Sequence, residues 1–176
     1  MKMMNMAFCD FPKKVILATD GSKNSLDAAK KTLELAKTSG AEVTLVHVIP
    51  QVRQLESVSL PTDYEQYQGG PSAVIPSSMQ MGLGEVVSME KDTDRHKTAK
   101  KIIESTEMIF KDSNIKINKK ILEGNVAQQI IKLANESGCD LVVVGATGHS
   151  SAGEFLLGST AEKIARFSNC PVMIVR

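Results

Sequence analysis

Apolar and polar residues follow one another in blocks whose spacing predicts strands and helices in alternation. Short apolar runs bounded by turn residues predict buried strands at about 14–19, 42–49, 140–145 and 171–175. A further strand is expected near 115–121, where isoleucines alternate partly with polar residues, as in an edge strand. Helical spacing predicts helices at about 22–38, 85–111, between Asn125 and Gly138, and at 159–168. Five strands and four helices in this order predict an α/β fold with a doubly wound parallel sheet covered by helices on both faces.

The predicted helix over 22–38 carries an apolar stripe, which we expect to face the sheet. The stripe consists of Leu26, Ala29, Leu33 and Ala36. Two other segments do not fit the alternation of strands and helices. Residues 1–12 are interpreted as a lead-in, and residues 50–84 mix Pro, Gly, Ser, Gln and Tyr without a period, which is typical of a loop or lid. We therefore expect one domain over 13–176 with a flexible insertion at about 50–84.

The segment after the strand at 140–145 is rich in glycine. Its glycines are Gly145, Gly148, Gly153 and Gly158, the last followed by Ser159 and Thr160, where a helical period begins. Glycine lets backbone N–H groups approach a ligand closely, and a helix start offers unpaired N–H donors, so the segment predicts an anion site suited to a polyphosphate. The alternative is that the glycines only mark turns and that Ser159 caps the helix, with Glu162 completing a capping box.

The spacing Gly145-x-x-Gly148, nine residues, then Gly158-Ser159-Thr160 resembles the nucleotide motif of the universal stress protein family, in its ATP-binding branch. The resemblance extends to Val15–Asp20, Val46–Ile49 and Asn169–Val175, and so covers most of the chain. It implies a Rossmann-like fold, similar to that of the adenine nucleotide alpha hydrolases, with strand order 3-2-1-4-5. In that order the chain reverses direction between the first and fourth strands, where open α/β sheets bind ligands.

The resemblance also implies a set of ligand-binding residues. The set is Ala18, Asp20, Val48, Gly145, Gly148, His149, Gly158, Ser159 and Thr160, for ATP with Mg²⁺ bridging phosphate oxygens. Asp20 would accept a hydrogen bond from a ribose hydroxyl, or alternatively cap the first helix. Val48 would offer backbone groups to the adenine edge, or be a plain core residue, and Ala18 would form an apolar wall. His149 would touch phosphate when protonated, or simply be exposed.

Composition narrows the classes of partner. A formal net charge of +1 gives no bulk attraction to nucleic acid, and 4% aromatic residues without tryptophan argue against a base-stacking platform. No apolar run approaches the roughly 18 residues of a membrane span, and the N-terminus does not resemble a signal peptide. Cys9, Cys139 and Cys170 are scattered without a C-x-x-C pair, as in a reducing compartment. We expect a cytoplasmic protein with neither nucleic acid nor membrane as partner.

The remaining polar motifs point away from fast catalysis. His47 is expected to be a core histidine bonded to backbone and His96 a solvated one, and the three histidines are too scattered for a zinc site. Gly153 to Thr160 fits the P-loop pattern except that Ser159 replaces its lysine, so phosphoryl transfer lacks a main electrostatic aid. We assign no catalytic residue, and expect at most slow ATP hydrolysis.

The function that follows is that of a nucleotide-responsive homodimer in stress response. The alternatives are an adenylyl-transfer enzyme, or a chaperone-like binding protein in which the nucleotide is structural. The homodimer is expected to form through the final strand, 171–175, which is apolar throughout and lies at a sheet edge in the implied order. The alternative is that residues 50–84 cover this edge within one chain.

Overall fold

The computed structural model describes residues 11–51, 93–148 and 157–176. They form a five-stranded sheet, all parallel, in the order β3-β2-β1-β4-β5. The strands are β1 (Lys14–Ala18), β2 (Glu42–Pro50), β3 (Ile117–Gly124), β4 (Leu141–Gly145) and β5 (Val172–Val175). The doubly wound parallel sheet and the implied strand order are therefore both confirmed.

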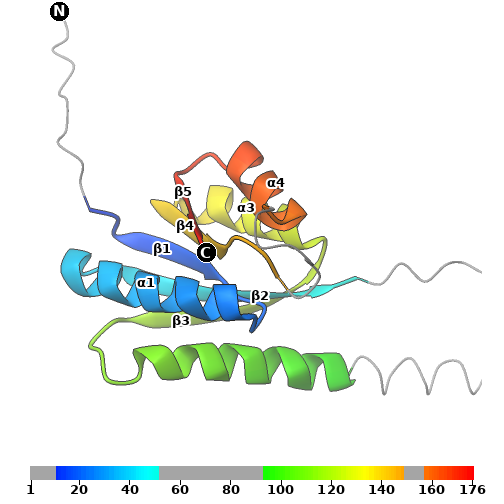
Figure 1. Cartoon of the computed structure of the whole chain (residues 1–176), viewed down its shortest axis with the longest axis horizontal. Helices are drawn as coiled ribbons and strands as arrows, with labels where there is room; N and C mark the ends of the chain where they lie inside the picture. Colours follow the sequence, from blue (N-terminus) through cyan, green and yellow to red (C-terminus); the bar gives the residue numbers. More distant parts are fainter. Residues whose placement is uncertain (1–10, 52–92, 149–156) are drawn as a thin grey trace, which may run out of the picture.

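Helices cover both faces of the sheet (Figure 1). They are α1 (Lys23–Ser39), a helix over 93–107 that continues as the 3₁₀ helix η1 (Met108–Phe110), α3 (Val126–Ser137) and α4 (Ser159–Phe167). In Figure 1, α1 is drawn over the sheet between β1 and β3, the green helix over 93–107 lies below it, and α3 and α4 lie at the top. The two core clusters place α1 and the helix over 93–107 on one face of the sheet, and α3 and α4 on the other. The part of the second helix predicted for 85–92 lies outside the described residues. None of the helices that the described residues form has the length and apolar content needed to cross a membrane.

The central strand β1 divides the core between these two faces. Val15 and Leu17 point into a cluster completed by residues of α1 and of the helix over 93–107 with η1. Ile16, between them, points into the opposite cluster with residues of α3 and α4. All three are at most 2% exposed. A strand buried on both faces reads as a continuous apolar run, which is why no polar alternation marks β1 in the sequence.

The predicted stripe of α1 is only partly correct. Ala29 and Ala36 are buried, but the other buried positions are Ser25, Ala28 and Thr32 in place of the two leucines. Small side chains bring the helix close to β4 and β1, and Thr32 satisfies its hydroxyl by donating to the Ala28 carbonyl, 2.8 Å away. Leu26 and Leu33 remain half-buried at the margins.

The helix ends follow local signals, with one correction. Asn125 caps α3 by accepting from the Gln128 amide, and Gly40 and Gly138 end α1 and α3 in the left-handed conformation, as the sequence indicates. The N-cap of α4 is Gly158, and no side chain caps this helix. The expected Ser159–Glu162 capping box is therefore wrong: Ser159 is already the first helical residue.

Candidate functional site

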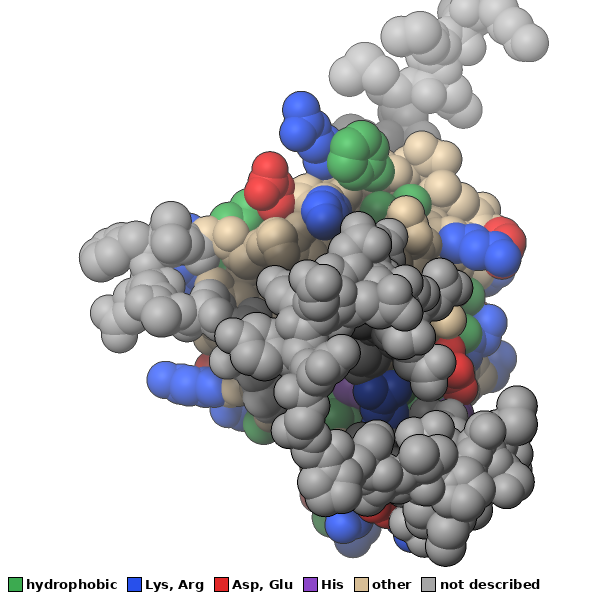
Figure 2. Space-filling view, turned by 90° about the vertical axis from the view of Figure 1, so that its right-hand side faces the viewer, with side chains coloured by type: hydrophobic (Ala, Val, Ile, Leu, Met, Phe, Trp, Pro, Cys, Tyr) green, Lys and Arg blue, Asp and Glu red, His purple; other side chains and the backbone are tan. Residues whose placement is uncertain are grey.

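The sheet changes direction between β1 and β4. The chain leaves β1 through α1 towards β2, on one side, and leaves β4 through α4 towards β5, on the other. The loops at the carboxyl ends of β1 and β4 therefore diverge, and the switch point between them, which we name the crevice, is the position at which such sheets bind ligands. Figure 2 looks on to this end of the molecule, and both basic and acidic side chains are present on the described surface that it shows.

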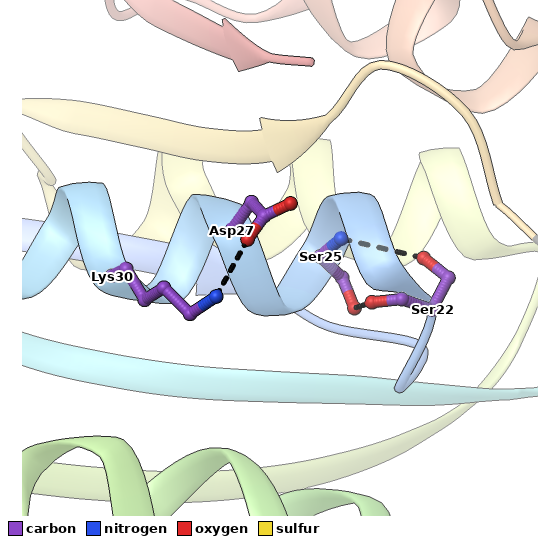
Figure 3. Close-up of polar contacts among 4 residues, drawn as sticks. All are labelled: Ser22, Ser25, Asp27 and Lys30. Atoms are coloured by element: carbon purple, nitrogen blue, oxygen red, sulfur yellow. Dashed lines mark hydrogen bonds and ion pairs between the residues drawn. The ribbon is translucent and has the colours of Figure 1, made fainter.

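Asp20 holds the turn between β1 and α1. Its Oδ1 accepts a hydrogen bond from the Ser22 amide at 3.0 Å, across Gly21, whose φ of 78° is left-handed. Ser22 is the N-cap of α1, with its hydroxyl oxygen 3.3 Å from the Ser25 amide (Figure 3). The interpretation of Asp20 as the helix cap is therefore wrong. Its second oxygen, Oδ2, lies beside Gly148 at the end of the loop that follows β4.

The three motif glycines are explained by close approach of other groups. A Cβ on Gly145 would lie 2.9 Å from the backbone of Asn24 and Ser25 in α1, and one on Gly148 would lie 2.5 Å from Asp20 Oδ2. A Cβ on Gly158 would lie 3.0 Å from the Ala146 carbonyl oxygen. None of the three has a positive φ, so interpreting them only as turn markers is insufficient. Each glycine lets a separate segment pack against the loop after β4.

The described residues of the motif consequently gather at one place. The Gly158 amide donates to the Ala146 carbonyl at 2.7 Å, and the Ala146 amide donates to the Val175 carbonyl at 2.7 Å. These bonds fix the start of α4 against the loop after β4. Ser159 and Thr160 lie in the exposed first turn of α4, where amide groups have no intrahelical acceptor. His149 lies outside the described residues, as does Gly153.

Val48 is a buried residue of β2, as one of its two predicted roles requires, and it lies beyond the end of the pairing with β1. Pairing between β1 and β2 ends at Ala18 and Val46, whereas β2 continues beside β3 as far as Pro50. Alternate residues of a strand turn their N–H and C=O groups to opposite sides. The Val46 carbonyl accepts from the Thr19 amide, so the backbone groups of Val48 face the same side, just beyond the end of β1. The Val48 side chain is only 5% exposed, and Ala18 is half-buried.

Two groups of contacts that no sequence pattern indicated hold the segments around the crevice together. Asn24, in the first turn of α1, donates from Nδ2 to both the carbonyl and the hydroxyl of Thr147. Below this, the buried Thr19 hydroxyl lies 3.0 Å from that of Thr106 and 3.3 Å from that of Ser25. These contacts tie the end of β1 to α1 and to the helix over 93–107.

The histidines are placed as follows. His47 Nδ1 lies 2.8 Å from the Thr19 carbonyl oxygen, which can only accept, so this nitrogen carries the proton. The expected backbone bond of His47 is thus confirmed, but the residue is half-buried and not part of the core. His96 is exposed as expected, but it also pairs with Glu123 at the end of β3, 2.8 Å from Nε2 to Oε1. Among the described residues no cluster of three or more His, Cys, Asp or Glu could hold a metal ion.

The strand order of the parallel sheet, with its switch point between β1 and β4, is that of an α/β protein of the Rossmann-like class. The chain belongs to the universal stress protein family, whose model matches residues 12–176. Universal stress protein MJ0531 of Methanocaldococcus jannaschii is 30% identical over 164 residues, covering 93% of this chain and 82% of that protein. Universal stress protein YxiE of Bacillus subtilis is 30% identical over 166 residues, covering 93% and 98%.

Solved structures share the fold at lower identity. MJ0577 of Methanocaldococcus jannaschii superposes with a TM-score of 0.70 at 24% identity, covering 94% of this chain and 96% of that one. A universal stress protein in complex with cAMP gives a TM-score of 0.61 at 22% identity, with coverages of 94% and 98%. One from Archaeoglobus fulgidus in complex with dAMP gives 0.59 at 16% identity, with coverages of 95% and 99%.

Proposed function

We propose that this chain binds ATP in the crevice at the ends of β1 and β4 and acts as a nucleotide-responsive homodimer in the stress response. One observation carries the proposal: the carboxylate of Asp20 lies against Gly148, in the loop to which the start of α4 is also fixed. A hydrogen-bond acceptor for a ribose and backbone donors for phosphates are thereby held side by side. The cAMP and dAMP complexes of two proteins with this fold support an adenine nucleotide as the ligand.

Each predicted residue has a role in this proposal. The backbone of Val48 would face the adenine edge, with Ala18 as an apolar wall, and Asp20 would accept from a ribose hydroxyl. Gly145 and Gly148 would leave room for the inner phosphates. Gly158, Ser159 and Thr160 would donate amide hydrogens to the outer phosphates at the positive end of α4. His149, outside the described residues, would add a cation there when protonated.

Magnesium fits this site only as a companion of the nucleotide. The described residues offer Asp20 as the carboxylate of the crevice, and it already accepts a hydrogen bond from Ser22. Mg²⁺ commonly keeps several waters and is held by few carboxylates together with phosphate oxygens. We therefore place it on the phosphates of ATP, where it would offset their charge.

A switch explains the site better than an adenylyl-transfer enzyme does. Transfer of an adenylyl group needs cationic groups aimed at the α-phosphate. The turn after β1 reads Thr19-Asp20-Gly21-Ser22 and supplies no such group. We expect ATP turnover well below the roughly 1 per second of ordinary enzymes. A steady-state assay on purified protein that gave several turnovers per second, abolished in Asp20→Ala, would replace the switch with an enzyme. A chaperone-like protein with structural nucleotide would retain its ligand through dialysis and show no turnover.

The proposed assembly is a cytoplasmic homodimer of a single domain over 13–176 that carries the insertion at 50–84. β5 lies at the sheet edge, and each of its residues is half-buried rather than buried. An apolar edge with outward-facing amide groups can be closed by antiparallel pairing with its copy across a two-fold axis.

Calorimetric titration of the full chain tests the binding proposal. ATP with Mg²⁺ should bind about tenfold or more tightly than AMP, because only ATP reaches the amides at the start of α4. Asp20→Asn should weaken ATP by about tenfold, because it removes a charged acceptor. Asp27→Asn is the matched control: Asp27 lies on α1 and its hydrogen bond with Lys30 lowers its pKa, so it too is charged at neutral pH (Figure 3). Equal affinities for ATP and AMP, or equal effects of the two substitutions, would contradict the proposal.

A further inference from the structure

Two cysteines that are 31 positions apart in the sequence meet in the fold. Cys139 and Cys170 lie with their sulfur atoms 3.2 Å apart. Cys139 is 8% exposed, between the end of α3 and the start of β4, and Cys170 is half-buried just before β5. The cysteines are scattered along the sequence, but the fold brings this pair together as two free thiols. Cys9 lies outside the described residues.

The backbone around both cysteines is held by the sheet. The Val142 amide donates to the Pro171 carbonyl at 3.0 Å, and Val142 pairs with Val172. Continuing this register back places Cys170 opposite Asp140, the residue next to Cys139. Asp140 is fixed in turn, because its Oδ2 accepts from the amides of Lys13 and Lys14. The S–S bond of a disulfide is about 2.0 Å long, so the two sulfurs, now 3.2 Å apart, need to approach each other by only about 1 Å.

We propose that Cys139 and Cys170 are a redox site, forming a reversible disulfide on exposure to a peroxide or to a low-molecular-weight disulfide. The site lies at the amino ends of β4 and β5, whereas the crevice lies at the carboxyl ends of the strands. The proposal does not rest on nucleotide binding.

The exposure of the two sulfurs sets the order of reaction. With hydrogen peroxide, the Cys170 sulfur attacks one oxygen, the O–O bond breaks, and Cys170 becomes a sulfenic acid as water leaves. The Cys139 sulfur then attacks the Cys170 sulfur and displaces a second water. Two thiols lose two protons and two electrons, and one peroxide becomes two waters. Burial, with the hydrogen bond to Cys170 second, raises the pKa of the Cys139 thiol to about 12, which makes it a poor first nucleophile and leaves the more exposed Cys170 to react first.

The disulfide would enclose the segment proposed to bind phosphate. The ring runs from Cys139 through β4, the glycine-rich loop and α4 to Cys170. Closing such a loop restricts the unfolded chain, which stabilises the folded state. For a chain of this length we expect the melting temperature to rise by about 5–10 °C on oxidation and to return on reduction.

Peroxide treatment of the full chain in a Cys9→Ser background tests the proposal. Titratable thiols should fall from two to none, with a mass loss of two hydrogen atoms. A non-reducing tryptic digest should contain peptide 133–163 joined to peptide 167–176. Glutathione disulfide should give the same product without a stable glutathione adduct. Dithiothreitol should restore both thiols and the original melting temperature.

Two single variants test whether the rise in melting temperature requires both cysteines. Cys170→Ala removes a half-buried side chain and should fold, keep the reduced melting temperature, and show no rise with peroxide. Cys139→Ala should likewise show no rise in melting temperature with peroxide. In this variant peroxide should oxidise Cys170 to a higher acid, and glutathione disulfide should glutathionylate it. Two thiols still titratable after oxidation, a lasting adduct on Cys170 in the Cys9→Ser protein, or a disulfide between two chains would each overturn the proposal.

Discussion

The carboxylate of Asp20 occupies the space beside Gly148: its Oδ2 lies 2.5 Å from the position that a Cβ on residue 148 would take. Asp20 lies in the turn after β1, and Gly148 ends the described part of the loop after β4. The lack of a side chain at residue 148 therefore makes room for the aspartate, which links two motifs far apart in the sequence. The neighbouring Gly145 is required for a different reason, because its Cβ would meet backbone atoms of α1.

This difference predicts separable effects of two alanine substitutions. Gly145→Ala pushes against backbone that cannot move aside, and should lower the free energy of unfolding by about 1–3 kcal/mol. Gly148→Ala meets only the end of an aspartate side chain, which can rotate away, and should cost less than about 1 kcal/mol. It should nevertheless weaken ATP binding, because it displaces the Asp20 carboxylate. Urea unfolding and calorimetry measure the two effects, and an equal stability loss in both variants would contradict the packing assigned to Gly148.

Substitution of Gly158 addresses the outer-phosphate end of the crevice. A Cβ at this position would lie 3.0 Å from the Ala146 carbonyl oxygen, and valine adds two methyl groups to it. Gly158→Val should therefore remove most ATP binding while the protein remains folded. Fluorescence titration with a labelled ATP and circular dichroism on the same sample check this. Wild-type affinity in a folded Gly158→Val protein would show that the phosphates bind elsewhere.

The hydroxyl pair of Thr19 and Thr106 should stabilise the site from below. Thr106 is fully buried, and its Oγ1 contacts both the Ile102 carbonyl and the Thr19 hydroxyl. Thr106→Val keeps the shape but removes the nearer of the two hydroxyl partners of Thr19, which should cost about 1 kcal/mol of unfolding free energy. Thr98→Val is the matched control, because Thr98 makes the same bond to a carbonyl four residues earlier, to Asp94, but is exposed.

A difference of less than about 0.3 kcal/mol between the Thr106 and Thr98 variants, measured by urea unfolding, would mean that the Thr19 contact contributes nothing.

The two edges of the sheet allow a controlled test of the dimer. The Pro171 and Val175 carbonyls accept bonds from the β4 side, so the amide of Ile174 points outward. By the same alternation, the Lys116 and Gly124 carbonyls face β2, so the amide of Ile121 points outward at the opposite edge. Ile174→Pro should give a folded monomer, because it removes a ladder donor between chains only. Ile121→Pro should leave the dimer intact.

Size exclusion with light scattering at micromolar concentration measures both variants. A soluble dimer in Ile174→Pro would show that the chains associate through another surface, and a wild-type monomer would remove the dimer altogether.

Local chemistry explains why much of this fold can be predicted from the sequence. The continuous apolar runs give β1 and β4, because a central parallel strand has no polar face. Asn125 and Gly138 give the limits of α3, because capping depends on groups within a few residues. The motif glycines mark the place of the crevice, although not the reason for each glycine.

Contacts between distant segments were decided only by the tertiary structure. Thr19 and Thr106 are 87 positions apart and Cys139 and Cys170 are 31 apart, and neither pair has a spacing that a periodic pattern could reveal. The buried face of α1 was mispredicted at Leu26 and Leu33 because hydrophobicity alone does not say how closely a helix approaches a sheet. Here Ser25, Ala28 and Thr32 let it approach closely. The Thr32 hydroxyl bonds within the helix, to the Ala28 carbonyl, whereas the Ser25 hydroxyl meets that of Thr19 only once the helix has packed against the sheet.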